Sequence, residues 1–277
     1  MKIAVVTGAS SGMGRETAIQ LADRFGGKLD ELWLIARRKE RLEELEGHLP
    51  VPLRLFPMDI TDPLSLEQLR LALEEMLPEV VFLVNAAGFG KIGRIGARPL
   101  ADETGMIQLN CQALCAVTHL VLPYMMREGR ILMYASSAAF LPQPKFAIYA
   151  ATKSFVLSYS RALHAELKPR GICVTAICPG PVDTEFFEIA ESGGRKIPLY
   201  KRLAMAAPKK VVKKAIRDSL MGKTQSIYGL WMKLFFLLSK AAPHGWLLKG
   251  WEVLDSLSGT DQTLPAQTPR EFDTKGF

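Results

Sequence analysis

Six short apolar segments, each followed by an amphipathic stretch, constrain the fold of this chain most strongly. The apolar segments lie at 2–7, 31–36, 52–57, 80–85, 130–135 and 171–178. Several are apolar almost throughout, as at 80–84, which is typical of strands covered on both faces. The amphipathic stretches that predict helices lie at 14–25, 39–48, 65–76, 104–126 and 148–167. This alternation predicts an α/β fold with a doubly wound parallel sheet.

The alternation stops near residue 190, and the rest of the chain has a different character. Residues 192–250 hold 13 Lys and Arg against one acidic residue, Asp218, a local charge of +12 in a chain whose net charge is +7. A basic helix is predicted from Pro208, and 227–238 is aromatic and apolar. We expect a single domain with three parts. These are a core at 1–190, a helical C-terminal extension at 191–257 and a loosely ordered tail at 258–277.

Composition indicates a globular protein that needs neither disulfides nor metals to fold, with 48% hydrophobic and 23% charged residues. Cys111 and Cys115 are one helical turn apart, but no His or carboxylate cluster accompanies them. We therefore expect core packing rather than a metal or redox site. The sequence shows neither a signal peptide nor ~18 uninterrupted apolar residues, which predicts a cytoplasmic protein. Lysines without interleaved aromatics in a recognised module disfavour nucleic-acid binding.

A glycine-rich turn, Thr7-Gly8-Ala9-Ser10-Ser11-Gly12-Met13-Gly14, follows the first predicted strand and opens a helix. Glycines let the backbone approach a pyrophosphate, and the free N–H groups of the helix start stabilise its charge. A tight strand–helix connection would look similar. The position at a strand end favours the nucleotide site of a Rossmann-type fold.

The end of the second predicted strand indicates which nicotinamide cofactor binds. An acidic residue there would accept hydrogen bonds from the ribose 2′-hydroxyl, whereas Arg suits a 2′-phosphate. The chain has Arg37, Arg38 and Lys39 and no carboxylate before Glu40. These cations could also be solvated residues of a helix start. We expect NADP(H).

Tyr149 and Lys153 lie one turn apart on one face of a predicted helix. A phenol titrates near ~10 in water, too high for acid–base catalysis at neutral pH. A neighbouring cation favours the phenolate and lowers that pKa. Because the spacing occurs by chance in many helices, the pair alone indicates only a candidate.

Five sequence elements together resemble the short-chain dehydrogenase/reductase family in its compact single-domain form. In chain order they are Thr7 to Gly14, Asn85-Ala86-Ala87-Gly88, Asn110, Ser136 and Tyr149 to Lys153. Their order and spacing match the family across roughly 1–190. The resemblance implies an oxidoreductase that transfers hydride between a nicotinamide and a carbonyl or secondary alcohol of an apolar substrate.

The resemblance also implies a catalytic set of Asn110, Ser136, Tyr149 and Lys153. Tyr149 matches the general acid/base, and Lys153 matches the residue that holds the nicotinamide ribose and lowers the pKa of the tyrosine. Asn110 matches the residue that positions a helix kink and a relay water. Ser136 lies 13 positions before Tyr149, as the serine of the family usually does. Its neighbour Ser137 stays open as the alternative.

The implied cofactor-binding set comes from the strand ends and the loops that follow them. It comprises Gly8, Ser10, Ser11, Gly12, Met13, Gly14, Arg37, Arg38, Asp59, Ile60, Asn85, Ala86, Gly88, Tyr149, Lys153, Pro179, Gly180, Val182 and Thr184. Asp59 matches the adenine-contacting position and Asn85 the residue that braces the central strand. Val182 and Thr184 would hold the carboxamide. No metal is expected.

Two other functions stay open. One is an NAD-dependent alcohol dehydrogenase of the same fold, and the other is a non-catalytic NADP(H)-binding regulator. Proteins of the second kind usually lose the tyrosine or the lysine, whereas both are present here. The family often assembles through two long helices, which predicts a homodimer or homotetramer.

The segment after the sixth predicted strand is expected to cover the substrate. Its apolar candidates for the pocket wall are Phe186, Phe187, Tyr200, Leu203 and Met205. Two interpretations of 227–251 stay open. The segment packs on the body or on a partner subunit, which is the commoner outcome, or it is an amphipathic helix that meets a membrane or a long lipid-like substrate.

Overall fold

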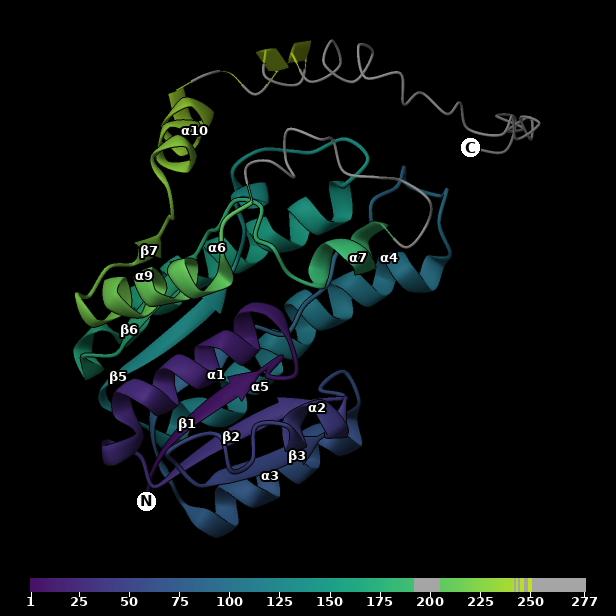
Figure 1. The fold of residues 1–277 in the computed structure, drawn as a ribbon. Helices are drawn as coiled ribbons and strands as arrows, with labels where there is room; N and C mark the ends of the chain where they lie inside the picture. Colours follow the sequence, from purple (N-terminus) through teal and green to yellow (C-terminus); the bar gives the residue numbers. More distant parts are fainter. Residues whose placement is uncertain (192–204, 242, 244, 247–248, 251–277) are drawn as a thin grey trace, which may run out of the picture.

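Seven parallel strands form one sheet in the order β3-β2-β1-β4-β5-β6-β7 in a computed structural model (Figure 1). The structure describes residues 1–191, 205–241, 243, 245–246 and 249–250. The strands are β1 (Lys2–Thr7), β2 (Glu31–Ala36), β3 (Leu53–Pro57), β4 (Glu79–Asn85), β5 (Met125–Tyr134), β6 (Cys173–Ile177) and β7 (Gln225–Ser226). The six predicted strands are confirmed, and the short β7 was not foreseen.

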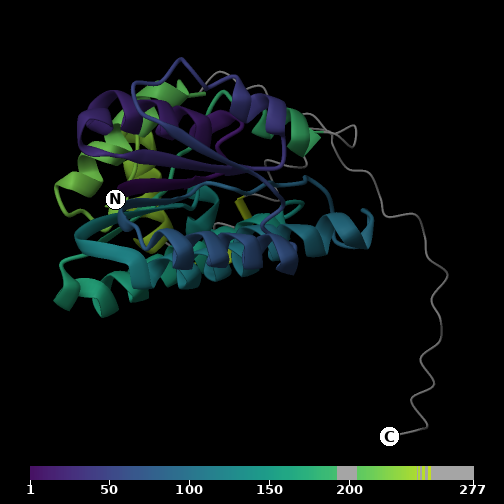
Figure 2. The same cartoon turned by 90° about the horizontal axis from the view of Figure 1, so that it is seen from below.

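Helices cover both faces of the sheet, which is the Rossmann-type arrangement (Figure 2). The α-helices are α1 (Gly12–Phe25), α2 (Lys39–Glu43), α3 (Pro63–Met76), α4 (Leu100–Ile107), α5 (Leu114–Val121), α6 (Ala147–Leu167), α7 (Phe186–Glu191), α9 (Pro208–Leu220) and α10 (Leu230–Ala241). Helices α3, α5 and α6 pack in the core on one face, and α1, α2 and α9 pack on the other.

The central strands are apolar because both of their faces are covered. All residues of β1 after Lys2 are buried, and β1 pairs with β2 on one side and β4 on the other. The chain order of the strands reverses between β1 and β4. In such sheets a crevice opens at the carboxyl ends of the strands where the order reverses. The fold therefore predicts a ligand site at the ends of β1, β2 and β4.

The helix expected at 104–126 differs from the one observed. A π-helical segment (Gln108–Ala113) separates α4 from α5, and α5 ends at Val121. Pro123 lies in the 3₁₀ turn that follows, Leu122–Tyr124, where its ring and missing N–H prevent continuation as an α-helix. Met125 then begins β5 and pairs with Val80 of β4. The helix expected at 39–48 is shorter as well, since α2 ends at Glu43 and turns follow.

The same stretch, Leu100–Tyr124, is the one helical region among the described residues that is long and apolar enough to span a bilayer by length and composition. Its buried side chains include Met106, Leu114, Val117 and Val121, of which the last three belong to the main core. A core helix of a globular fold passes the same composition test.

The C-terminal extension continues the same body. Val212, Ala215 and Ile216 of α9 are buried in the core beside α1, and β7 extends the sheet next to β6. Helix α10 follows and projects from the carboxyl end of the sheet (Figure 1). The tail expected at 258–277 lies outside the described residues, as do Tyr200 and Leu203.

Candidate active site

Two adjoining pockets open at the carboxyl ends of the strands. The glycine-turn pocket, a cavity of about 300 Å³, lies over the ends of β1, β2 and β4. It is lined by Gly8, Ser10, Ser11, Gly12, Met13, Gly14, Ile35, Ala36, Arg37, Arg38, Met58, Asp59, Ile60, Ala86, Ala87, Gly88, Phe89, Leu109, Thr184, Phe186 and Ile189. The tyrosine pocket, of about 320 Å³, lies beside it around Tyr149. Met13, Thr184 and Phe186 line both cavities, so the two form one continuous site.

The glycine turn brings backbone close to backbone at the mouth of the first pocket. Gly8 has a φ of +69°, and a Cβ there would lie 2.7 Å from the amide nitrogen of Ala87. A Cβ on Gly14 would collide with the carbonyl oxygen of Gly8. Ser11 caps α1 without a side-chain hydrogen bond, and the first turn has no acidic residue. The helix start thus has amide donors that no capping side chain occupies, which fits an anionic phosphate group.

Charged side chains line the far edge of the glycine-turn pocket. Arg38 lies 2.9 Å from Glu185 and donates a hydrogen bond to Ser10 Oγ over 3.3 Å. Arg37 lies 3.7 Å from Asp59, whose Oδ1 accepts a hydrogen bond from the amide of Thr61. The two arginines of the sequence prediction therefore do lie at this pocket. Sequence reasoning missed Glu185, although it directly follows the predicted carboxamide-holding Thr184.

Asn85 lies at the end of β4 but lines neither pocket. It is buried, and its Nδ2 donates a hydrogen bond of 2.9 Å to Thr118 Oγ1 on α5. Thr7, at the end of β1, holds the residues just after β4, because its Oγ1 accepts hydrogen bonds from the amides of Ala86 and Ala87. Both residues hold the floor of the site, and this position suits the bracing role expected of Asn85.

Tyr149 lies in the first turn of α6 and faces the second pocket. The side chain is 7% exposed, and its ring stacks on Phe146 with the centroids 4.3 Å apart. Burial raises the pKa of the phenol, and a hydrogen bond with the Ser136 side chain opposes this effect without cancelling it. The amide of Ser137 instead donates to the carbonyl of Pro179. Of the two candidate serines, Ser136 is the one paired with the phenol.

Lys153 lies one turn further along α6 and is 6% exposed. Its Nζ donates a 2.7 Å hydrogen bond to the carbonyl of Tyr134 and lies 5.6 Å from the centre of the Tyr149 ring. Among the described residues, no carboxylate forms an ion pair with it. Burial lowers the pKa of Lys153 to about 8. A Cβ on Gly88 would lie 3.4 Å from Nζ, so the ammonium is just beneath the floor of the glycine-turn pocket.

Asn110 occupies the π-helical segment and has no exposed surface. Its Nδ2 donates to the Phe89 carbonyl and to Thr152 Oγ1, and its Oδ1 accepts from the Phe89 amide, all within 3.0 Å. The side chain thereby ties the kinked helix to the loop after β4 and to α6. Sequence reasoning missed Thr152, which lies between Tyr149 and Lys153.

The walls of the tyrosine pocket are mostly apolar. Phe186 and Phe187 of α7 lie there as predicted, and the Phe186 ring is 5.3 Å from that of Tyr149. Met232 and Phe235 of α10 also line the pocket, which sequence reasoning missed. Of the predicted loop after β6, Pro179, Gly180, Val182 and Thr184 line the pocket. Met205 is described but does not.

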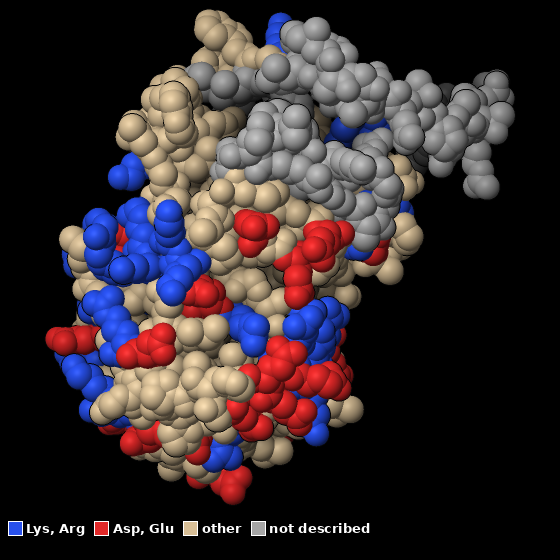
Figure 3. Space-filling view, in the orientation of Figure 1, with Lys and Arg blue, Asp and Glu red and all other residues tan. Residues whose placement is uncertain are grey.

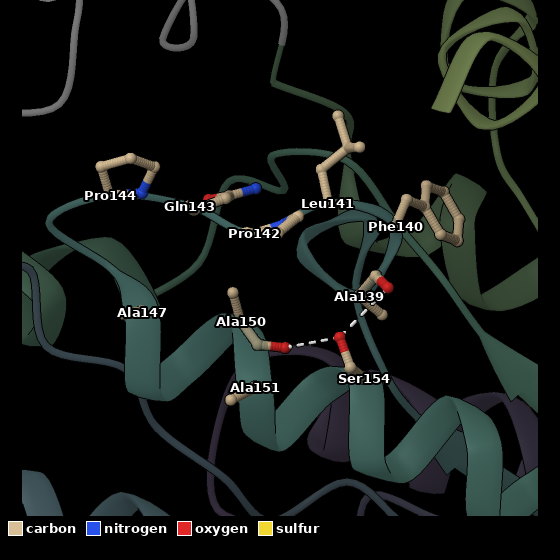
Figure 4. A pocket seen from close by; sticks show the side chains of 10 residues that line it. All are labelled: Ala139, Phe140, Leu141, Pro142, Gln143, Pro144, Ala147, Ala150, Ala151 and Ser154. Carbon is tan, nitrogen blue, oxygen red and sulfur yellow. Dashed lines mark hydrogen bonds between the residues drawn. The ribbon is translucent and has the colours of Figure 1, made fainter. Parts of the chain in front are cut away.

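A third and larger cavity, of about 480 Å³, lies between the loop after Ala139 and the first half of α6 (Figure 4). Its walls are alanine, proline, phenylalanine and leucine side chains, together with Gln143 and Ser154. Ser154 Oγ donates to the carbonyls of Ala139 and Ala150. Among the residues that the structure describes, no titratable side chain lines this cavity, so these residues offer no acid, base or charged ligand group there. The buried titratable side chains Tyr149 and Lys153 lie instead at the other two pockets. Among the described residues, no three His, Cys, Asp or Glu side chains are grouped to hold a metal ion.

Comparison with known proteins shows the family of this chain. A family model described as short chain dehydrogenase matches residues 2–193. The mouse very-long-chain 3-oxoacyl-CoA reductase is 32% identical over 271 residues, which cover 89% of this chain and 82% of that protein. Its similarity thus extends into the C-terminal extension.

Solved structures share the fold over most of the chain. A short-chain dehydrogenase from Sphingobium yanoikuyae in complex with NADPH superposes with a TM-score of 0.72, at 26% identity, over 98% of this chain and all of that one. A 3-ketoacyl-(acyl-carrier-protein) reductase from Brucella melitensis complexed with NADH has a TM-score of 0.69, at 24% identity, over 82% and 95% of the two chains. The chain belongs to the short-chain dehydrogenase/reductase family. It is an oxidoreductase with a Rossmann-type fold.

Proposed function

We propose that this protein reduces the carbonyl group of an apolar substrate with NADPH and uses Tyr149 as the proton donor. The observation that carries the proposal is the Ser136–Tyr149 pair at the wall of an apolar pocket that is continuous with the glycine-turn pocket. The substrate oxygen would accept hydrogen bonds from both hydroxyls, which stabilises the negative charge that develops there. The bound nicotinamide supplies the hydride.

The protonation states support reduction. Burial raises the pKa of Tyr149, so the phenol is protonated at neutral pH, and it can still donate its proton to the substrate alkoxide because an alkoxide is the stronger base. Lys153, with a pKa of about 8, can supply the proton that replaces the one donated by Tyr149 at a pH close to neutral. From the sequence we expect Lys153 to lower the pKa of the phenol, but in the structure burial raises this pKa and the opposing group is Ser136. Asn110 holds the kinked helix beside this pair, and its role as a positioning residue for a relay water belongs to the same proposal.

NADP(H) is favoured over NAD(H) because Arg37 and Arg38 lie at the edge of the glycine-turn pocket beyond β2. One observation favours the alternative, since Glu185 and Asp59 partly neutralise these cations. The dissociation constants of NADPH and NADH decide between the two. We expect NADPH to bind more tightly than NADH. Arg38→Ala should weaken NADPH binding and leave NADH binding nearly unchanged. Tighter NADH binding would overturn this cofactor assignment.

The lining of the tyrosine pocket favours a bulky apolar substrate. Its aromatic and Met side chains offer no charged partner, so a small anionic substrate would be poorly held. The mouse relative acts on very-long-chain 3-oxoacyl-CoA according to its name, and its similarity includes the segment that contributes Met232 and Phe235. A long-chain or aromatic ketone is therefore the substrate class we propose.

The test compares Tyr149→Phe with Tyr159→Phe, a half-buried tyrosine on the same helix. NADPH oxidation is followed with a panel of aromatic and long-chain ketones, and the NADPH dissociation constant is measured by fluorescence. We expect Tyr149→Phe to lower kcat by about 10³-fold with NADPH affinity retained, because general acid–base catalysis contributes on this scale. The control should keep its rate. A Tyr149→Phe enzyme with undiminished kcat would refute the assignment. A wild-type protein that binds NADPH but turns over no ketone would favour the regulator.

We also propose a cytoplasmic homo-oligomer. Four free cysteines suit a reducing compartment. Phe155 of α6 is 42% exposed and stacks on Tyr159, so this helix presents an apolar aromatic surface suited to a second copy. Light scattering of the purified protein tests this state directly.

A further inference from the structure

Exposed apolar side chains concentrate on α10 and just beyond it. Six of the sixteen large exposed hydrophobic residues of the described chain lie between 230 and 246. They are Leu230, Trp231, Leu234, Leu237, Leu238 and Trp246, and their exposed fractions run from 44% to 79%. Scattered single hydrophobic residues need no explanation, but a contiguous group of this size marks an interaction surface.

Helix α10 has two apolar faces with different surroundings. The inner face carries Met232, Phe235 and Phe236, which pack against the core, and the Phe236 ring is 4.9 Å from that of Phe140. The outer face carries Leu230, Trp231, Leu234, Leu237 and Leu238. Their spacing places them on one stripe covering roughly a third of the helix circumference. The inner face already anchors the helix, so the outer face remains for a partner.

Cations border this outer face on one side. Lys233 and Lys240 are two turns apart at one border of the apolar stripe, and both are exposed. On α9, which precedes α10 in the chain, the exposed cations Lys209, Lys210, Lys213 and Arg217 share one face. Within the described part of the chain, none of these four forms an ion pair. Figure 3 shows the basic side chains gathered over α9, beside the mainly uncharged surface of the projecting α10.

The apolar outer face of α10 and the cations near it together indicate, by their charge, what kind of partner binds there. A second copy docked through the same patch would bring two strongly basic segments together, which costs like-charge repulsion. An anionic lipid surface instead attracts every one of these cations and accepts Leu and Trp side chains at the headgroup boundary. We infer that α10 docks this protein on an anionic membrane surface, with the cations of α9 facing the lipid headgroups.

The docking helix is also a wall of the substrate pocket, because Met232 and Phe235 line that cavity from its inner face. A Cβ on Gly180 would lie 2.6 Å from Met232 Sδ, so α10 packs directly on the loop after β6. The pocket therefore lies next to the lipid boundary. We infer in addition that the substrate is an amphiphilic ketone that enters the pocket from the membrane surface. This addition, unlike the docking itself, rests on the proposed function.

The experiment is vesicle flotation of the full-length protein with phosphatidylcholine alone and with a phosphatidylcholine–phosphatidylglycerol mixture. We expect binding to the mixed vesicles to exceed binding to the neutral ones by about tenfold and to fall at high salt. The double variant Trp231→Asp/Leu237→Asp should lose binding. The matched control Leu64→Asp/Leu71→Asp, which alters two exposed leucines of α3, should retain it. Lys209→Glu/Lys213→Glu should weaken binding without touching the apolar face.

Thermal melts verify that all variants fold, and light scattering reports their oligomeric state. Equal flotation of the α10 and α3 variants would overturn the inference. So would equal binding to neutral and mixed vesicles, or conversion of an oligomer to a monomer by Trp231→Asp/Leu237→Asp, since the face would then lie between copies. Flotation does not depend on turnover. The membrane-docking inference can therefore be refuted without refuting the proposed activity, and the Tyr149→Phe test can refute the activity without refuting the docking.

Discussion

Two buried charges lie in different regions of the molecule, and the protein treats them differently. Asp218, on α9, is 1% exposed and accepts hydrogen bonds from Lys214, Lys223 and Ser226. Lys153, in the active site, is 6% exposed, and its one hydrogen-bond partner among the described residues is the carbonyl of Tyr134. One charge is neutralised within the fold, and the other is not.

The pKa values follow this difference. Burial by itself raises the pKa of Asp218, but the hydrogen bonds from its three partners outweigh burial, and the pKa lies below its usual value. For Lys153 burial dominates, and the pKa falls to about 8 from a usual 10.5. A charge with its partners in place stabilises the fold, whereas a buried charge without a counter-ion is typical of a functional site. The comparison favours a structural role for Asp218 and is consistent with the catalytic role proposed for Lys153.

The largest expected effect is on activity. Lys153→Met should lower kcat/KM for ketone reduction by about 10³-fold, because it removes both the proton source and a ligand for the cofactor ribose. The melting temperature should not fall, since the substitution removes a buried charge. Steady-state kinetics and thermal melts of this variant and of Lys28→Met, an exposed control, test the assignment. A large loss of stability with little loss of activity would reverse the comparison.

The next largest effect is on stability. Asp218→Asn should lower the free energy of unfolding by about 3 kcal/mol, because it leaves two lysines beside a group that no longer balances them. Activity per folded molecule should stay unchanged. Since the pKa of Asp218 is lowered in the fold, its contribution is present above the usual pKa of 3.8 and is lost as the pH falls through the folded value. Urea unfolding is compared with that of Asp23→Asn, an exposed substitution. Equal stabilities of the two variants would contradict the structural role.

The smallest effect is a pH dependence that sharpens the contrast. With its folded pKa below the unfolded one, Lys153 binds fewer protons in the native state between about pH 8 and 10.5. Its contribution to stability therefore increases as the pH rises through this window. The unfolding free energy of the wild type minus that of Lys153→Met should rise by about 2 kcal/mol from pH 7 to pH 10. A constant difference across this range would show that Lys153 is not desolvated.

Much of the core could be predicted from the amino-acid sequence alone. The six strands, the glycine turn and the Tyr149–Lys153 pair follow from local rules: an apolar run between helices, a turn after a strand, and a spacing of one helical turn. Boundaries failed where a distant contact decided them. Met125 reads as the end of an apolar helix, but pairing with Val80 makes it the first residue of β5.

The site shows the same division. Its nucleotide half comes from consecutive residues such as Gly8 to Gly14, so a short motif suffices to predict it. The substrate half combines residues that are far apart in the chain, as with Tyr149 and Met232. At the edge of the nucleotide half, Arg38 and Glu185 are equally distant in the chain. No spacing rule links such pairs, because their distance depends on how the loop after β6 and the C-terminal extension pack.

The amino-acid sequence by itself determined the doubly wound sheet, the family and the residue types of the proposed catalytic set, because periodicity and short motifs depend on neighbours in the chain. Only the tertiary structure decided that Ser136 rather than Ser137 meets the phenol, that Lys153 is buried without a carboxylate, and that α10 has an outer apolar face. Each of these depends on burial and on contacts between distant segments, and both arise only when the chain packs.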